Sequence, residues 1–198
     1  MVWLEVETKV KLRKDEVPVL REKILKIAKF VKKGRKGDDY FAIRRFRKKK
    51  YPKKAFRIRA TKDEFEVNFK KWLRKHWTHD IVVKQEFEFK LKGKDAVEDL
   101  LALFRDLGFR EWVKKTKYNE TYSYKKDKRL SIEINNVKHL GYFIEMEYLC
   151  KLTEIEKARE KIREVLKILK INPEQIDNTG YTKMLWYKGI MDKRYFID

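Results

Sequence analysis

Hydrophobic and polar residues alternate along most of the chain, a pattern typical of β-strands that bury one face. We expect eight strands, over Val2–Leu12, Tyr40–Ile43, Ala55–Ala60, Phe65–Trp72, Ile81–Leu91, Tyr118–Lys125, Arg129–Val137 and Tyr142–Leu149. Because short turns separate most of these segments, the strands should pair largely antiparallel. Eight strands are also enough to close a small barrel.

Longer segments between the strands have the apolar spacing of amphipathic helices. We expect helices over Asp15–Val31, Asp95–Leu107, Thr153–Lys170 and Thr182–Tyr187. Asp15 should cap the first helix, and Gly34 should lie just past its end. The second and third helices open with Asp95 and Glu98 and with Thr153 and Glu156, the spacing of a capping box.

The helices and the strands together predict one fold. Each apolar helix stripe needs an apolar surface, and one face of each strand supplies it. Glycine (7 residues) and proline (3 residues) are scarce, so no flexible linker divides the chain. We therefore predict an α+β fold in one domain over residues 1–198, a closed eight-stranded antiparallel β-barrel with flanking amphipathic helices. If the apolar strand faces lie outward under the helices, charged residues line the barrel's interior.

Those charged residues come in pairs, at alternating positions of the predicted strands. Acidic pairs are Glu5 and Glu7, Glu86 and Glu88, and Glu145 and Glu147; basic residues in the same register are Arg57, Arg59, Lys70, Lys115 and Lys117. On any single strand such a pattern is typical of a solvated face. Its repetition over many strands favours a charged lining, which is costly unless the charges pair, hold metal or bind a ligand.

The residue types indicate what that ligand would be. Clustered carboxylates prefer hard cations with oxygen ligands, such as Mg²⁺ or Mn²⁺. Clustered arginine and lysine bind phosphate oxygens, and arginine does so as a two-pronged donor. A divalent-metal site beside a group of basic residues is typical of enzymes that act on polyphosphates.

Composition agrees with an anionic partner. The 198 residues include 52 Lys and Arg against 31 Asp and Glu, a net charge of +21, which favours nucleic acid, polyphosphate or a phosphorylated small molecule. The chain has no apolar run as long as a membrane span, and Met1–Glu5 does not resemble a signal peptide. A single cysteine, Cys150, excludes a disulfide framework. We expect a cytoplasmic protein without membrane contact.

The order of motifs resembles the CYTH superfamily, the triphosphate tunnel metalloenzymes that include class IV adenylate cyclases and thiamine triphosphatases. Glu5-Val6-Glu7-Thr8-Lys9 resembles the ExExK signature. Later segments resemble the family's DxYF, LRIR, TxK, RxExE, KxR, LGxFxExE and closing SY segments, in that order: Asp38–Phe41, Phe56–Arg59, Asn68–Lys70, Lys84–Glu88, Lys115–Lys117, Leu140–Glu147 and Tyr181. The resemblance covers nearly the whole chain and implies a closed eight-stranded barrel around a polar tunnel.

The resemblance also implies roles for individual residues. Divalent metal, Mg²⁺ or Mn²⁺, would be held by Glu5, Glu7, Glu145 and Glu147, with Glu86 and Glu88 near the metal end. Catalysis would rest on Glu5, Glu7, Lys9, Glu145 and Glu147. The triphosphate would be gripped by Lys9, Arg57, Arg59, Lys70, Lys84, Lys115 and Lys117.

Three positions depart from the family pattern. Lys84 and Lys117 stand where arginine is usual, so the charge stays but the two-pronged geometry is lost. Asn135 stands where the family often has aspartate. The loss of that carboxylate would affect the second metal or the choice of reaction, unless Asn135 is a structural hydrogen-bonding residue.

Three functions are compatible with these residues. The first is metal-dependent hydrolysis of inorganic, nucleoside or thiamine triphosphate with release of phosphate. The second is a class IV adenylate cyclase, in which the ribose 3′-hydroxyl attacks the α-phosphate of ATP and pyrophosphate leaves. The third is a non-catalytic polyphosphate- or RNA-binding module, against which the three acidic pairs argue. The basic run Arg44–Lys54 could bind RNA, extend the tunnel mouth or be a solvated hairpin. A dimer is compatible with the sequence.

Overall fold

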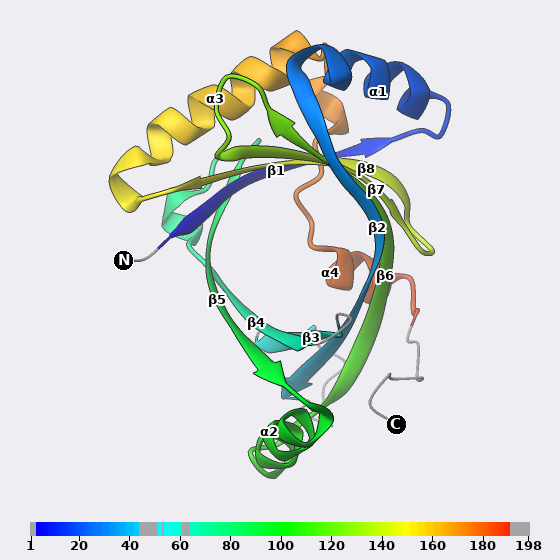
Figure 1. Ribbon diagram of the computed structural model, residues 1–198, viewed down its shortest axis with the longest axis vertical. Coiled ribbons are helices and arrows are strands. Elements are labelled where there is room, and N and C mark those ends of the chain that lie inside the picture. The colour runs from blue at the N-terminus through cyan, green and yellow to red at the C-terminus, as the bar shows by residue number, and fades with distance from the viewer. Residues whose placement is uncertain (1–2, 44–50, 53, 61–63, 191–198) are drawn as a thin grey trace. The chain divides into compact units, whose positions relative to one another are not determined.

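The computed structural model describes residues 3–43, 51–52, 54–60 and 64–190. Its strands form a closed barrel in the order β1-β5-β4-β3-β2-β6-β7-β8 (Figure 1). The strand pairs with a defined register, among them β1 with β8 and β3 with β4, are antiparallel. The predicted fold class is therefore confirmed. Most of the basic run over 44–54, namely residues 44–50 and 53, lies outside the described residues.

The eight strands correspond to the eight predicted from the sequence. They are β1 (Leu4–Leu12), β2 (Ala28–Ile43), β3 (Ala55–Ala60), β4 (Glu64–Trp72), β5 (Val82–Lys92), β6 (Phe109–Tyr124), β7 (Leu130–Val137) and β8 (Gly141–Cys150). Six of them match the expected bounds to within two residues at each end. The other two, β2 and β6, begin much earlier than predicted.

The missed parts of β2 and β6 have too little alternation to indicate a strand. Residues 28–39 contain seven charged side chains and two glycines, and most side chains there are exposed. Because β2 and β6 are neighbours in the barrel, each supplies backbone hydrogen-bond partners that extend the other. Tertiary pairing thus makes strands where local sequence does not.

Four helices and three short 3₁₀ turns complete the described chain. They are α1 (Glu16–Ile27), α2 (Lys94–Asp106), α3 (Ile155–Ile168) and α4 (Tyr181–Tyr187), with η1 (Arg74–His76), η2 (Leu152–Glu154) and η3 (Pro173–Gln175). The predicted first helix ended four residues too late, because β2 begins at Ala28. Val31, expected in its apolar stripe, is 54% exposed, and Gly34 lies inside β2.

The predicted helix caps were also wrong. Asp15 makes no side-chain cap and instead pairs with Arg13 at 3.4 Å. No side-chain cap begins α2 either, since Gly93 precedes it and Glu98 pairs with Lys94.

The capping box of the third helical segment lies two residues earlier than predicted. The Lys151 N–H donates to the Glu154 carboxylate at 3.0 Å, so Thr153 and Glu156 do not form the box. The expected end of α2 is present, because Gly108 follows it with a φ of +87°, a conformation that favours glycine.

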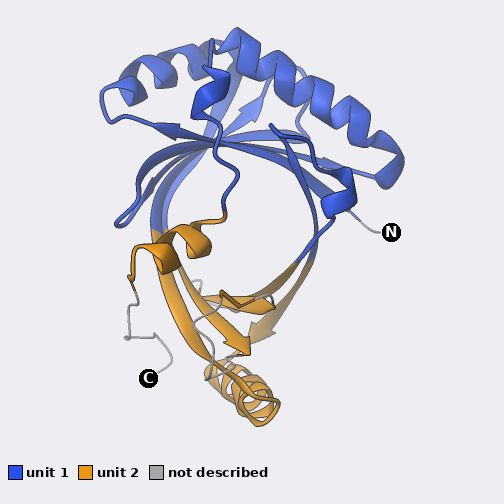
Figure 2. Ribbon diagram, turned by 180° about the vertical axis from the view of Figure 1, so that it is seen from behind, with its two compact units in different colours: residues 1–35, 71–86, 117–179 blue, residues 36–70, 87–116, 180–198 orange. Residues whose placement is uncertain are grey.

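Described residues group into two compact units (Figure 2). Unit 1 comprises residues 1–35, 71–86 and 117–179, and unit 2 comprises residues 36–70, 87–116 and 180–198. Each unit takes parts of several strands from distant places in the sequence. The single domain expected over residues 1–198 stays a prediction.

Unit 1 has the larger hydrophobic core. In Figure 1, α1 and α3 lie over β1, β7 and β8, and the core forms between the helices and this part of the barrel wall. Its fully buried members include Val6 of β1, Ile144 of β8, Ile24 of α1 and Ile162 of α3. The apolar faces of these strands are therefore turned outward under the helices, as predicted, which leaves their charged faces inside the barrel.

Unit 2 has a smaller, aromatic core around α2. Val97 and Leu101 of α2 are buried with Ile58 of β3. The ring of Phe56 lies 4.5 Å from that of Phe104, between ring centroids, and 5.2 Å from that of Phe41. No helix among the described residues is long and apolar enough to cross a membrane.

Candidate functional site

The first strand shows how the sequence places charges on the inner side of the barrel. Val6 and Val10 of β1 are fully buried in the core of unit 1. Alternation puts Glu5, Glu7 and Lys9 on the opposite face, where they too are buried, with exposures of 8, 9 and 2%. Charged groups so far from solvent need partners, and the neighbouring strands provide them.

Three carboxylates of unit 1 form a cluster. Glu5, Glu7 and Glu147 each offer one oxygen, and these oxygens lie within 4.8 Å of one another. Glu7 and Glu147 are direct register partners across β1 and β8, so antiparallel pairing brings two distant parts of the sequence together. An all-oxygen, multiply charged donor set of this kind fits a hard divalent cation such as Mg²⁺ or Mn²⁺.

A buried lysine balances this cluster. Lys84 of β5 is the register partner of Glu5, and its ammonium bonds to the carboxylate of Glu7. Burial acts to lower the pKa of Lys84, but the charges of Glu7 and Glu5 outweigh it and hold that pKa above its usual value. Lys84 therefore stays protonated beside the cluster at neutral pH.

Lys9 is held by the segment that follows α3. Its backbone N–H donates to Oδ1 of Asn178 at 2.8 Å, and its ammonium donates to the carbonyl of Thr179. Burial lowers the pKa of Lys9, and the nearby carboxylates of Glu145 and Glu7 oppose that shift. The ammonium thus has a fixed position within unit 1.

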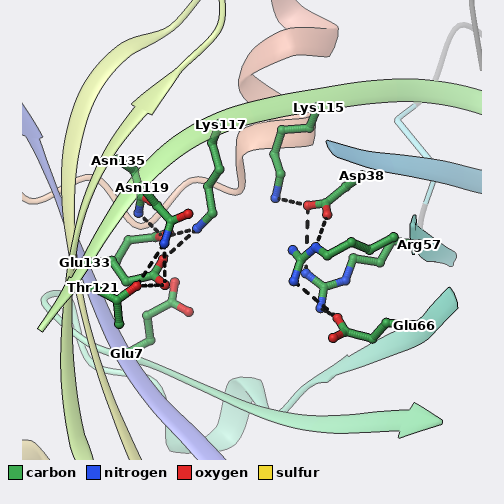
Figure 3. Close-up of polar contacts among 12 residues, drawn as sticks. Glu7, Asp38, Arg57, Glu66, Lys115, Lys117, Asn119, Thr121, Glu133 and Asn135 are labelled. Atoms are coloured by element: carbon green, nitrogen blue, oxygen red, sulfur yellow. Dashed lines mark hydrogen bonds and ion pairs between the residues drawn. The ribbon is translucent and has the colours of Figure 1, made fainter. Parts of the chain in front are cut away.

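A second polar group in unit 1 surrounds Lys117 of β6 (Figure 3). The Lys117 ammonium lies 2.8 Å from a carboxylate oxygen of Glu133 and 3.3 Å from one of Glu145. Asn135 donates to Glu145 at 2.7 Å, and Thr121 donates to Glu133 at 3.1 Å. Burial would raise the pKa of Glu145, but the charges of Lys117 and Lys9 outweigh burial and hold that pKa below its usual value. This carboxylate therefore stays ionised.

Strand β7 carries a carboxylate close to Asn135, the position where the family often has aspartate. Glu133 of β7 is the direct register partner of Glu145, two residues before Asn135. A shift of two residues keeps a side chain on the same face of a strand, so the acidic group is present at the next inward position. Asn135 is fully buried and acts as a hydrogen-bond donor to Glu145.

Unit 2 contains the basic counterpart, centred on one buried carboxylate (Figure 3). Asp38 of β2 is fully buried, and its oxygens lie 2.6 Å from Nε of Arg59 and 2.7 Å from the ammonium of Lys115. Arg57 approaches the same carboxylate at 3.8 Å. Burial would raise the pKa of Asp38, but these three cations lower it well below its usual range.

Two further carboxylates of unit 2 contact the arginines. Glu66 of β4 lies 2.5 Å from Arg57 and 3.2 Å from Arg59, and Glu88 of β5 lies 3.7 Å from Arg57. Burial acts against the charge of Arg57, but Asp38 and the other acidic groups hold its pKa above the usual value. The Nε atom of Arg57 is buried without a hydrogen-bond acceptor in the described part of the chain.

The predicted site residues are thus distributed over both units. The acidic cluster contains Glu5, Glu7 and Glu147, whereas Glu145 pairs with Lys117 in the same unit. Glu88 contacts Arg57 and Asn68 of unit 2, at distances of 3.7 and 3.2 Å. The structure brings Glu5, Glu7 and Glu147 together, and the metal-binding, catalytic and triphosphate-binding roles of all these residues stay predictions.

Sequence reasoning missed three acidic residues of these clusters. Asp38 belongs to the DxYF segment, but no role was assigned to it. Glu66 and Glu133 carried a usable signal, because each stands in the alternating register of its strand, at even spacing from Asn68 and Asn135. Glu66 forms an alternating acidic pair with Glu64, whereas Glu133 is a single acidic residue on its strand.

The fold and the charged clusters together define a class of protein. It is an antiparallel β-barrel with clustered carboxylates in one unit and, in the other, a basic group around a buried carboxylate. The CYTH domain matches residues 4–181. The chain belongs to the CYTH family, as its motifs indicated.

Solved structures agree on the fold. A protein of Pyrococcus horikoshii OT3 is 28% identical, with a TM-score of 0.71 over 93% of this chain and 99% of that one. A candidate adenylate cyclase of Vibrio parahaemolyticus (12% identity, TM-score 0.70, 93% and 99% covered) and a candidate adenylyl cyclase of Hippeastrum with a dominant triphosphatase activity (14% identity, TM-score 0.64, 96% and 98% covered) share the fold. No curated protein matches the chain.

Proposed function

We propose that this protein is a divalent-metal-dependent enzyme that hydrolyses a triphosphate and releases phosphate. The observation that carries the proposal is the cluster of Glu5, Glu7 and Glu147, whose oxygens lie within 4.8 Å of one another. Carboxylates repel phosphate unless a cation intervenes, so an acidic cluster in a phosphate-binding family is best explained by a metal.

Each group of residues has a part in the proposed reaction. Glu5, Glu7 and Glu147 would hold Mg²⁺ or Mn²⁺, which supplies charge neutralisation and an activated water when bound. Arg57, Arg59 and Lys115 would bind phosphate oxygens, since guanidinium and ammonium groups already held by carboxylates can accept an anion in the same geometry. Lys9, Lys84 and Lys117 would neutralise further charge as water attacks the terminal phosphorus.

The class IV adenylate cyclase reaction is the second candidate. It is favoured by the segment Asp38–Phe41, because Asp38 is the buried centre of the basic group and Tyr40 accepts a hydrogen bond from Lys115 at 3.2 Å. The Hippeastrum protein with a dominant triphosphatase activity favours hydrolysis. Both reactions use the same metal and the same phosphate-binding residues.

Product analysis tests the proposal. The protein is incubated with inorganic triphosphate, ATP or thiamine triphosphate and Mg²⁺ or Mn²⁺, and the products are separated. Orthophosphate supports the hydrolase. Cyclic AMP with pyrophosphate would assign the cyclase instead. Retention of a triphosphate without turnover would leave a binding module, the third function considered from the sequence.

A matched pair of variants checks that the cluster is responsible. Glu7→Gln removes one charge and keeps the volume, whereas Glu160→Gln makes the same change at an exposed position of α3. Turnover should be lost only in the first variant. Full activity in excess EDTA would contradict the proposal. The cytoplasmic location and binding of nucleic acid through the outer surface stay predictions.

A further inference from the structure

Trp72 breaks the pattern of charged and polar residues on the inner face of β4. The side chains of Glu66 and Asn68 lie on the face of β4 that meets the arginines of β3, since Arg57 pairs with Asn68 and Arg59 with Glu66. Alternation places Lys70 and Trp72 on that same face. A tryptophan is the one large aromatic side chain in this row of the strand.

The ring of Trp72 lies beside the acidic cluster of unit 1. The ammonium of Lys84 is 5.1 Å from its ring centre, and that ammonium bonds to Glu7. Glu7 in turn belongs to the group of three carboxylates with Glu5 and Glu147. One lysine therefore separates the indole from the proposed metal site, with all of these residues in unit 1.

Trp72 is both exposed and held in place. It is 40% exposed, whereas Trp112 is 1% exposed. Trp77 packs edge-on against its ring, with centroids 5.4 Å apart and planes at 74°, and the Trp77 indole N–H donates to the carbonyl of Val83 at 3.1 Å. The protein thus braces an aromatic side chain that it leaves partly exposed.

We propose that Trp72 stacks on a flat heterocycle attached to the triphosphate, so that the substrate is an organic triphosphate rather than inorganic triphosphate. This inference rests on the proposed function, because it requires the triphosphate to lie at the acidic cluster. Every nucleobase has a π-face, and stacking of one base on an aromatic side chain strengthens binding by about 5- to 150-fold. A thiazole or aminopyrimidine ring offers the same chemistry.

The test compares ligands with and without a ring. Binding of inorganic triphosphate and of a non-hydrolysable ATP analogue is measured by calorimetry in Mg²⁺, for the wild type and for Trp72→Leu. Loss of the ring should weaken binding of the ATP analogue about tenfold or more and leave inorganic triphosphate within about twofold. Turnover of ATP, GTP and thiamine triphosphate then distinguishes a nucleobase from a thiamine ring.

Two further variants test the same inference if Trp72→Leu folds poorly. Trp72→Phe keeps an aromatic ring and should restore most of the affinity for the ATP analogue. Phe87→Ala removes an exposed aromatic side chain from the face of β5 opposite Glu86 and Glu88. This variant should bind both ligands as the wild type does. Quenching of tryptophan fluorescence by the ATP analogue should also be reduced in Trp72→Phe.

The outcomes separate this inference from the proposed function. Equal losses for both ligands would place Trp72 in the support of Lys84 and overturn the stacking role. No loss for either ligand would overturn it as well. If the wild type binds neither ligand, the proposed function fails first. If the wild type binds inorganic triphosphate as tightly as the ATP analogue, the stacking role of Trp72 fails and the proposed function stands.

Discussion

The two units of this barrel balance their buried charges differently. In unit 1, Glu5, Glu7, Glu133, Glu145 and Glu147 meet Lys9, Lys84 and Lys117, so acidic groups are in excess in this set. In unit 2, Arg57, Arg59 and Lys115 surround Asp38, and Glu66 and Glu88 also contact the arginines.

This difference shows what each unit is suited to bind. An excess of carboxylates attracts a cation, which would relieve the repulsion among Glu5, Glu7 and Glu147. A buried carboxylate such as Asp38 instead fixes three cations in position, so that they can meet an anion without reorganising. The same strand alternation thus places an acidic cluster in one unit and a basic group in the other, which under the proposed function would bind metal and phosphate oxygens, respectively.

Removing Asp38 should have the largest effect and should fall on stability. Asp38→Asn leaves buried cations without their central partner, which typically costs about 3–5 kcal/mol. Denaturant unfolding of Asp38→Asn and of Asp106→Asn, an exposed position of the same unit, provides the comparison. Equal stability of the two variants would show that Glu66 and Glu88 suffice to balance the cations.

Acid should weaken the contribution of Asp38. The pKa of this group is lower in the folded protein than in the unfolded chain, so its stabilisation is complete above the unfolded pKa and is lost as the pH falls toward the folded value. We therefore expect the stability difference between the wild type and Asp38→Asn to shrink from about pH 5 downward. A difference that grew in acid would reverse the assignment of charge.

Glu7→Gln should have the next largest effect, on turnover rather than on folding. Glu7 would act by holding the metal that neutralises transition-state charge, and loss of one such stabilising interaction typically lowers kcat by about 10²–10³-fold. The rate is measured over a range of Mn²⁺ concentrations, beside Glu160→Gln. Recovery of the full rate at high Mn²⁺ would mean that Glu7 tunes metal affinity alone.

Arg57→Ala should weaken binding of triphosphate. A charge-assisted contact to phosphate is worth about 1.5–3 kcal/mol, or roughly 10- to 150-fold in affinity. Arg110→Ala changes an exposed arginine of unit 2 and should have little effect. If both variants bound equally well, the basic group of unit 2 would be structural.

Neutralising the basic run should have the smallest effect on the reaction. Replacement of Lys48, Lys49, Lys50, Lys53 and Lys54 should remove most RNA retention, which should also fall steeply with salt. Triphosphate turnover by the same variant should change by less than about twofold, since the sequence places no triphosphate-binding residue in this run. Loss of both activities from a folded variant would place this run in the active site.

Much of the fold could be predicted because alternation is a local property. A residue such as Val6 is apolar and its neighbours Glu5 and Glu7 are charged, so the strand and its two faces follow from the sequence alone. The strand β3 was predicted to the residue for the same reason. The first twelve residues of β2 lacked this pattern, and the extent of the strand depends on its partner.

Candidate site residues divide in the same way. The sequence by itself determined which strands carry acidic pairs, since Glu5 and Glu7 must share a face. Only the tertiary structure decided which pairs meet: the register of β1 with β8 brings Glu147 to Glu7, while Glu88 lies beside Arg57. It also revealed Asp38 as the centre of the basic group. The physical reason is that strand order and register are set by long-range pairing and burial, which no local pattern encodes.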